Sequence, residues 1–226
     1  MVIYRSVHHQ LFRYSSPDVS LKFLQGSVKV TTLKACRNAE KEYFKDEGEG
    51  TQAITSLPGR NSLEASDLAK LLGVEPAAIH VNGENAVVTE GIDAIRREER
   101  LADAFIFCTS SFEADPHMLK KFGNGCIKIV NPVNFFELLD DHLRRVVAPI
   151  KLEHCIVDDV EYAPRIGTYR NSSDKHIAFL KPSGQPKDFE KESEVRAVWI
   201  PSQYAIEPIF LNIPVIANLM EAITSE

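Results

Sequence analysis

Three glutamates stand at alternate positions in one run near the end of the chain: Glu190, Glu192 and Glu194. The run continues into the apolar residues Val198-Trp199-Ile200, so we expect a strand over 189–200. Residues two apart on a strand share a face, and the three carboxylates would therefore point the same way. Carboxylates so placed can do acid–base work or stabilise a developing positive charge. The structural alternative is a solvated strand face balanced by Lys and Arg on neighbouring strands.

Two further groups could contribute to such chemistry. Arg13 lies in a short predicted strand, and its guanidinium is a permanently charged fork that suits phosphate. The hydroxyl cluster Thr109-Ser110-Ser111 ends an apolar run, and hydroxyls such as those of Thr109 and Ser111 can hold Glu194 or a sugar without adding charge. Both groups also have structural interpretations. Hydroxyls at a strand end are common in turns, and Arg13 could pair with the acidic loop 46–49.

In this order the three groups resemble the Arg/Ser/Glu group of ADP-ribosyltransferases. That pattern has a first-strand Arg, an aromatic residue followed by an STS-like cluster, and an ExE that runs into an apolar strand. Here the elements read Leu11-Phe12-Arg13, Phe107-Cys108-Thr109-Ser110-Ser111-Phe112 and Glu192-Ser193-Glu194-Val195-Arg196. The chain departs from the pattern by reading TSS in place of STS, and it has no aromatic-rich turn before ExE beyond Phe189.

The chain is also similar to an uncharacterised group of bacterial proteins. These have an aromatic-Arg/Lys-aromatic opening strand, a Phe-x-x-Ser strand in the middle and a Glu-x-Glu-x-Arg strand near the end. This similarity supports the alignment of the three segments. It carries no information about the substrate, because a fold can outlive its catalytic activity.

The resemblance implies a site that cleaves NAD, the co-substrate. Glu194 would be the catalytic carboxylate, stabilising an oxocarbenium-like state at the ribose, and Glu192 would orient or deprotonate the acceptor. Phe112 would stack on nicotinamide. The other residues implied to bind the dinucleotide are Arg13, Tyr14, Thr109, Ser110 and Ser111.

The resemblance also implies a fold and a biological role. The fold would be α+β, an ADP-ribosyltransferase-like split β-sandwich with flanking short helices, as a single domain over 1–226. The activity would be mono-ADP-ribosyl transfer to a macromolecular acceptor, in a bacterial toxin or anti-phage effector with a neutralising antitoxin as partner. Protein, RNA, DNA and small molecules remain open as acceptors.

Two alternatives stand beside this interpretation. An NAD glycohydrolase would use the same pocket, with water in place of the acceptor. A non-catalytic binding module would present the three glutamates as an acidic edge, and Phe135-Phe136 or Trp199 would form its partner surface.

Other chemistries lack their sequence patterns. The seven histidines show no i, i+4 spacing and the four cysteines no CxxC, so we expect no metal site. Neither GxSxG nor a Walker loop occurs. A net charge of −6 argues against a broad nucleic-acid-binding surface. Scattered cysteines, interpreted as core thiols, and the lack of a signal or membrane segment predict a cytoplasmic protein without membrane contact.

Short helices precede a strand-rich last third, which favours an α+β fold. We expect strands at 11–14, 27–33, 104–109, 125–130, 153–162, 176–180 and 189–200. Expected helices begin after the Ser16-Pro17, Asp115-Pro116 and Asn131-Pro132 pairs and end before Gly26, before Gly123 and near Val147. Two more are expected at 34–44 and 62–72. A hairpin around Asn82-Gly83 and loops at 46–50, 164–175 and 181–188 complete the prediction.

Overall fold

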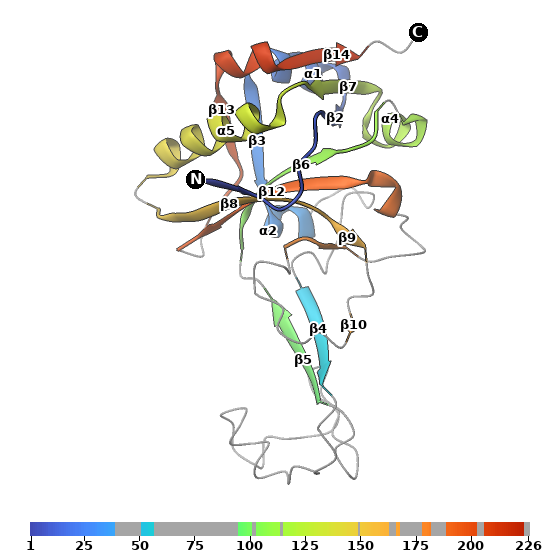
Figure 1. Cartoon of the computed structure of the whole chain (residues 1–226), viewed down its shortest axis with the longest axis vertical. Coiled ribbons are helices and arrows are strands. Elements are labelled where there is room, and N and C mark those ends of the chain that lie inside the picture. The colour runs from blue at the N-terminus through green and yellow to red at the C-terminus, as the bar shows by residue number, and fades with distance from the viewer. Residues whose placement is uncertain are drawn as a thin grey trace.

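The computed structural model describes residues 1–38, 51–56, 95–100, 103–113, 115–148, 150–162, 166–167, 178–181, 189–202 and 206–223. Within these ranges a nine-stranded sheet forms the body of the molecule (Figure 1). Its strands are β1 (Val2–Tyr4), β2 (Leu11–Ser15), β3 (Ser27–Thr32), β6 (Phe105–Ser110), β7 (Gly125–Ile129), β8 (Leu152–Asp159), β12 (Glu194–Pro201), β13 (Ile209–Asn212) and β14 (Met220–Ile223).

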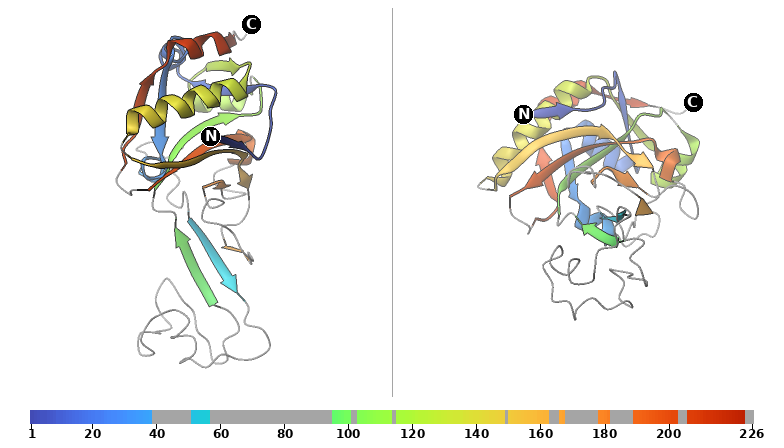
Figure 2. Two further views of the ribbon diagram at one scale, coloured as in Figure 1. Left: turned by 60° about the vertical axis from the view of Figure 1, so that its left-hand side comes forward. Right: turned by 60° about the horizontal axis from the view of Figure 1, so that its bottom comes forward.

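Few helices accompany this sheet in the described ranges. They are α1 (Pro17–Leu24), α2 (Leu33–Arg37), α4 (Pro116–Phe122) and α5 (Pro132–Val147), with 3₁₀ helices η2 (Phe189–Glu192) and η3 (Pro214–Leu219). Two small sheets complete the fold: β10 (Ile166–Gly167), β4 (Thr51–Ser56) and β5 (Ile95–Arg100), and the pair β9 (Glu161–Tyr162) and β11 (Leu180–Lys181). The β4–β5 ribbon projects away from the body (Figures 1 and 2).

The main sheet branches at β6. Its strand order is β1-β8-β12-β6-β2-β7-β14, and β3 joins β6 as a second neighbour that in turn pairs with β13. The first half of β6 pairs with β3 through Phe105 and Ile106, whereas its last residue, Ser110, pairs with Phe12 of β2. The sheet therefore opens between β2 and β3. A large open sheet with few helices is compatible with the predicted α+β class.

Alternate residues of the central strands face two different packing layers. On β12, Val195, Ala197 and Trp199 join the largest apolar cluster, which includes residues of α1 and α5. Val198 belongs to a separate cluster with Leu33 of α2. Helix α5 lies on one side of the sheet in Figure 2. Glu194 and Arg196 alternate with these apolar residues on β12 and therefore face the opposite side of the sheet.

Local capping explains why the predicted helices form where they do. Asn131 caps α5 by accepting from the amide of Asn134, and Asp115 caps α4 by accepting from two amides. At Gly26 the backbone has φ +90, and a Cβ there would lie 2.5 Å from the Ile213 carbonyl oxygen. The predictions of α1, α4, α5 and the strands β2, β3, β6 and β7 are confirmed within a residue or two.

Several predictions differ from the structure or lie outside the described residues. The strand expected at 153–162 divides into β8 and β9, and the stretch expected as a loop at 164–175 contains the short strand β10. Of the residues expected as a strand at 176–180, Ala178 and Phe179 form a turn, and β11 begins only at Leu180. Helix α2 ends at Arg37, and the rest of the predicted 34–44 helix lies outside. So do the loop at 46–50, the helix at 62–72 and the Asn82-Gly83 hairpin. Of the loop expected at 181–188, Lys181 belongs to strand β11 instead, and the rest lies outside.

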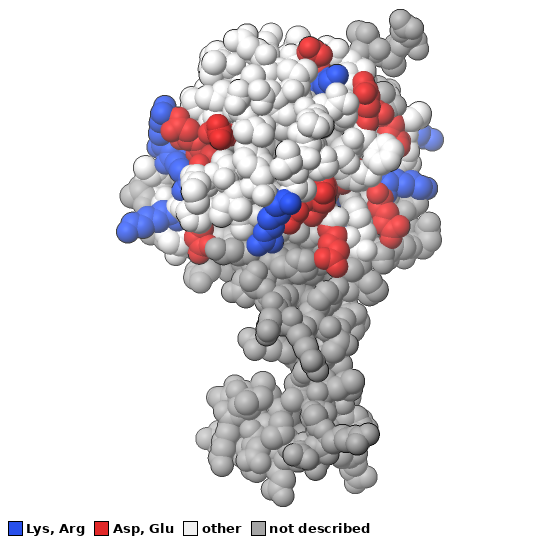
Figure 3. Space-filling model, viewed as in Figure 1, with Lys and Arg blue, Asp and Glu red and all other residues white. Residues whose placement is uncertain are grey.

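The surface of the described residues carries both signs of charge. Lys and Arg side chains alternate with Asp and Glu across the face shown in Figure 3, without a broad basic patch. None of the helices in the described ranges is long and apolar enough to cross a membrane.

Candidate active site

The glutamate run does not form the continuous strand expected at 189–200. Phe189–Glu192 is the 3₁₀ helix η2, Ser193 has φ 41, and β12 begins only at Glu194. That prediction is wrong because a left-handed Ser193 interrupts the alternation on which it was based. Glu190 is exposed, so the three carboxylates do not share one face. Glu192 and Glu194 are nevertheless brought together, each 5% exposed, by the bend between them.

The hydroxyl cluster at the end of β6 fixes this bend. Thr109 Oγ1 donates to the Val195 carbonyl over 3.0 Å, and Ser110 Oγ donates to the Glu192 carbonyl over 2.8 Å. Ser111 Oγ donates to the carbonyl of Ser193 over 3.3 Å. The expectation that Thr109 and Ser111 hold the Glu194 side chain is therefore corrected. Their hydroxyls bind the main chain around it, because β6 and β12 are paired strands.

Cations occupy both oxygens of both carboxylates. Arg196 Nε lies 2.7 Å from Glu194 Oε1, and Lys181 Nζ lies 2.5 Å from Glu194 Oε2. Glu192 receives Lys121 Nζ at 2.5 Å on Oε1 and Lys181 Nζ at 2.6 Å on Oε2. Lys181 therefore bridges the two glutamates and links them into one charged network.

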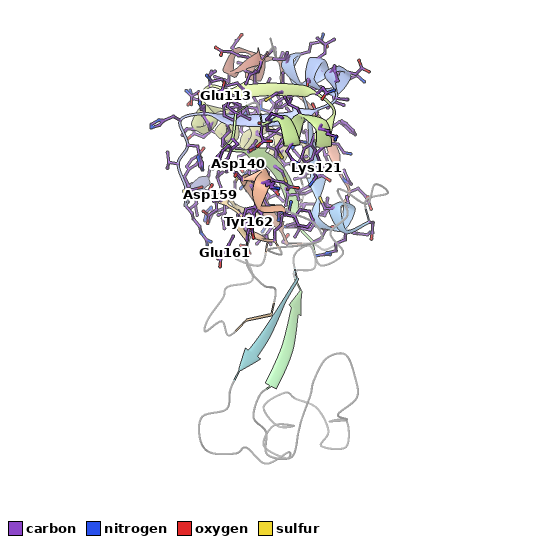
Figure 4. The ribbon with its side chains drawn as sticks, turned by 90° about the vertical axis from the view of Figure 1, so that its right-hand side faces the viewer. Glu113, Lys121, Asp140, Asp159, Glu161 and Tyr162 are labelled. Atoms are coloured by element: carbon purple, nitrogen blue, oxygen red, sulfur yellow. The ribbon has the colours of Figure 1, made fainter. Side chains whose placement is uncertain are left out.

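Aromatic rings support the two ammonium groups. The Nζ of Lys121 and that of Lys181 lie 5.2 and 4.7 Å from the centre of the Phe189 ring. Cation–π contacts of this kind stabilise a cation away from water. Figure 4 shows Lys121 and Tyr162 on either side of the orange ribbon of η2 and β12. The buried ring of Phe189 in η2 therefore contacts both lysine ammonium groups of the charged network.

The electrostatics keep Glu194 ionised. Burial alone raises the pKa of a carboxyl, but Arg196 and Lys181 hold the pKa of Glu194 well below its usual range. Burial and the neighbouring Glu194 carboxylate raise the pKa of the Cys108 thiol, which stays protonated beside it. Burial likewise raises the pKa of Tyr162, whose hydroxyl oxygen accepts the Glu194 amide over 2.8 Å. Glu194 is thus a carboxylate at any physiological pH.

A cavity of about 140 Å³ opens beside this cluster. It is lined by Phe12, Arg13, Tyr14, Cys36, Cys108, Thr109, Ser110, Met118, Phe122, Lys181, Phe189, Glu192, Glu194 and Arg196. Six of the eight residues predicted for the site are among them. Ser111 and Phe112 are not, and Phe112 is 57% exposed, with its carbonyl accepting the Tyr14 hydroxyl over 2.5 Å.

Arg13 and Tyr14 reach the cavity from β2, and both have structural contacts. The guanidinium of Arg13 donates to the Cys108 carbonyl, where β6 changes its partner from β3 to β2. It also lies 5.0 Å from the centre of the Phe107 ring. Burial raises the pKa of Tyr14 to about 12, so its hydroxyl stays neutral. The acidic loop 46–49 proposed as a partner of Arg13 lies outside the described residues.

Sequence reasoning missed the residues that hold the glutamates. Arg196 could have been predicted as a partner of Glu194, because it follows Glu194 by two residues and residues two apart on a strand share a face. Lys121, Lys181 and Tyr162 lie 71, 11 and 32 residues from their partners, and no local pattern links them.

The partner surface expected of a binding module does not exist. Phe135, Phe136 and Trp199 are each 0% exposed, because they form the core between α5 and the sheet. Cys126 and Cys155 are buried as expected, whereas Cys36 and Cys108 are half-buried at the cavity. In the described ranges, no three His, Cys, Asp or Glu residues gather in a group that could hold a metal ion.

Comparison of the chain with protein-family models, with curated proteins and with solved structures found no match.

Proposed function

We propose that this protein cleaves NAD at the cavity beside Glu194 and transfers the ADP-ribose to a macromolecular acceptor. The observation that carries the proposal is the convergence of three segments far apart in sequence. Arg13, Ser110 and Glu194 lie on β2, β6 and β12, which are neighbours in one sheet, and all three line the same cavity. These are the segments on which the resemblance to ADP-ribosyltransferases rests.

The chemistry needs a carboxylate that is ionised before the substrate arrives. As the bond between nicotinamide and ribose breaks, its electron pair leaves with nicotinamide and positive charge develops at the ribose. Glu194, kept ionised by Arg196 and Lys181, is the group proposed to stabilise that charge. The acceptor then bonds to the ribose carbon, and its proton passes to Glu192 or to water.

The cavity suits one part of the dinucleotide. Pockets for whole drug-sized ligands measure roughly 300–1,000 Å³, so about 140 Å³ corresponds to a single ring and its immediate surroundings. Phe12, Tyr14, Phe122 and Phe189 give it aromatic walls on which nicotinamide could stack. Arg13 at the rim is the proposed phosphate ligand. Thr109 and Ser110 would contribute indirectly, by fixing the bend before Glu194 through their hydrogen bonds to its main chain. Ser111, which binds the Ser193 carbonyl, and Phe112 would contribute from outside the cavity lining.

Glu192 is the residue proposed to orient or deprotonate the acceptor. Both of its oxygens are paired with lysine ammonium groups, so an acceptor would meet Glu192 together with Lys121 and Lys181. Acceptor class, the split β-sandwich fold and the role as a toxin or anti-phage effector neutralised by an antitoxin remain proposals that rest on the resemblance. Hydrolysis of NAD is the alternative outcome at the same site.

The proposal is tested by incubating the purified protein with NAD labelled in its adenosine part, alone and with cell lysate. Free nicotinamide and label retained on macromolecules are both measured. Retained label that nuclease or protease removes would establish transfer and the acceptor class, whereas nicotinamide release without retention would identify a hydrolase. Glu194→Gln should abolish both signals. Glu190→Gln is the matched control, since Glu190 belongs to the same run but is exposed. Absence of cleavage and of NAD binding would refute the proposal.

A further inference from the structure

The segment from Ala178 to Lys181 contacts both Glu194 and Arg196. Lys181 Nζ lies 2.5 Å from Glu194 Oε2, and the Ala178 carbonyl accepts Arg196 Nη1 over 2.6 Å. Ala178 is 0% and Lys181 7% exposed. This buried segment therefore contacts both the carboxylate and its arginine partner.

The strand paired with this segment holds the Glu194 main chain. Lys181 of β11 is in register with Tyr162 of β9, whose hydroxyl oxygen accepts the Glu194 amide over 2.8 Å. The Phe179 carbonyl accepts the Glu161 amide over 2.8 Å and joins the two strands further. The β9–β11 pair thus fixes Glu194 at two points, the amide through Tyr162 and the carboxylate through Lys181.

The closest cation differs between the two oxygens of Glu194. Arg196 Nε donates to Oε1 over 2.7 Å and Arg196 Nη2 donates to Oε2 over 3.4 Å, while Lys181 Nζ lies 2.5 Å from Oε2. A carboxylate held closely on one oxygen and only over a long hydrogen bond on the other can still turn about its last single bond. A second cation on the other oxygen fixes the plane of the group and hence the direction in which its remaining lone pairs face the cavity.

We infer that Lys181 is a positioning residue for Glu194, fixing the orientation of its carboxylate at the cavity through the β9–β11 pair. The inference rests on the proposed function for its kinetic meaning. Its structural content, that Lys181 and not Lys121 sets the environment of Glu194, stands separately. A misplacement of about 1 Å in a reacting group can cost on the order of 100-fold in rate.

The chain supplies a matched control for this test. Lys121 and Lys181 each bind one oxygen of Glu192 at 2.5 and 2.6 Å, and each lies over the Phe189 ring. Their side chains are 10% and 9% exposed. Lys181 differs in its bond to Glu194, and Lys121 differs in a second ring contact, with its Nζ 5.5 Å from the centre of the Phe122 ring. Comparing Lys181→Met with Lys121→Met therefore isolates that bond from effects that pass through Glu192.

The kinetic experiment measures nicotinamide release from NAD as a function of NAD concentration and pH. Lys181→Met should lower kcat by about 10- to 100-fold with KM changed by less than about 3-fold, because orientation and not binding is lost. Lys121→Met should lose several times less. The acidic limb of the pH profile should move to higher pH in Lys181→Met only. An equal loss of kcat in both variants would overturn the inference. So would a higher kcat in Lys181→Met, because the lysine would then block the site and not position Glu194.

The expected pH shift follows from the groups that face Glu194. These are Arg196 on its own strand, Lys181 on β11, Cys108 on β6, Tyr162 on β9 and Glu192 in η2. Lys181→Met removes one of the two cations that oppose the effect of burial and leaves Arg196, so the pKa of Glu194 rises.

A second readout separates failure of the inference from failure of the proposed function. The carboxyl carbon of Glu194, assigned by its loss in Glu194→Gln, is followed by NMR between pH 4 and 8 without NAD. Its chemical shift should move in Lys181→Met and stay near the wild-type value in Lys121→Met. If the wild-type protein does not cleave NAD, this measurement alone decides the inference. An unmoved Glu194 signal in Lys181→Met would refute it.

Discussion

A buried carboxylate lies near each end of β12, and only one of the two lines the cavity. Glu194 at the beginning of the strand and Asp140, which binds Trp199 near its end, are both 5% exposed. Each lies within 2.8 Å of an arginine nitrogen. Burial opposes ionisation of both, yet hydrogen-bonding cations lower both pKa values.

The difference lies in what surrounds each carboxylate. Asp140 accepts Trp199 Nε1 over 2.9 Å and Arg144 Nε over 2.8 Å, so it ties α5 to the sheet. It does not line the cavity. Glu194 lines the cavity, and its partners come from β12 and from a separate strand pair. Burial and ion pairing therefore do not distinguish the two carboxylates, whereas the open volume beside Glu194 does.

The largest expected effect tests this difference in activity. Glu194→Gln should slow nicotinamide release by at least about 1,000-fold, equivalent to roughly 4 kcal/mol of transition-state stabilisation. Asp140→Asn should stay within about 3-fold of wild type once the folded fraction is accounted for, because it touches no cavity residue. Initial rates and urea unfolding curves are measured on both variants. Comparable losses of rate in the two variants would break the comparison.

The next effect concerns the free energy of unfolding. Arg196→Met should lower it by about 3–5 kcal/mol, because it leaves the Glu194 charge buried with one cation fewer. Arg144→Met should cost less, about 1–3 kcal/mol, since its side chain is 30% exposed and water can replace part of its hydrogen bonding. Urea denaturation monitored by Trp199 fluorescence measures both. If Arg144→Met lowers the free energy of unfolding more than Arg196→Met does, the Asp140 ion pair contributes more to stability than the Glu194 ion pair, contrary to this prediction.

Local rules predicted the outer elements of the fold, and long-range contacts determine the site. The Asn131-Pro132 and Asp115-Pro116 pairs specify where α5 and α4 begin, because capping is a property of adjacent residues. Branching of the sheet at β6 leaves no such local pattern. It depends on the tertiary pairing of β3 with the first half of β6 and of β2 with its last residue. The short strands β13 and β14 also pair with strands distant in sequence, and they were not predicted.

The candidate site shows the same division. The three motif segments were found because each is compact in sequence, and their strands are neighbours in the sheet. The bend at Ser193 was not predicted, because a left-handed serine has no strong local signature. Lys181 was placed in a loop, yet it supplies the cation that joins Glu192 and Glu194. Which lysine neutralises a buried glutamate is decided by tertiary packing.

Acid provides a smaller test of the comparison. Both carboxyls have a pKa below the ordinary values of about 4.3 for Glu and 3.9 for Asp, so their contributions to stability are complete above about pH 5 and are lost as the pH falls. Unfolded chains bind protons there that the folded chain does not. Glu194→Gln and Asp140→Asn should each flatten the fall in unfolding free energy between pH 5 and 3, measured by urea titration. A steeper fall in either variant would contradict the direction of that pKa shift.

The smallest effect concerns the bend that gives Glu194 its position. Ser193 has φ 41, which costs a residue with a Cβ about 1 kcal/mol relative to glycine. Ser193→Gly should therefore raise the unfolding free energy by up to about 1 kcal/mol, partly offset by the greater freedom of glycine in the unfolded chain. Ser193→Ala keeps the Cβ and should not stabilise. If both variants behave alike in urea denaturation, the serine hydroxyl and not the backbone conformation controls the bend. If Ser193→Gly is more stable but slower in NAD cleavage, rigidity at this turn contributes to the placement of Glu194.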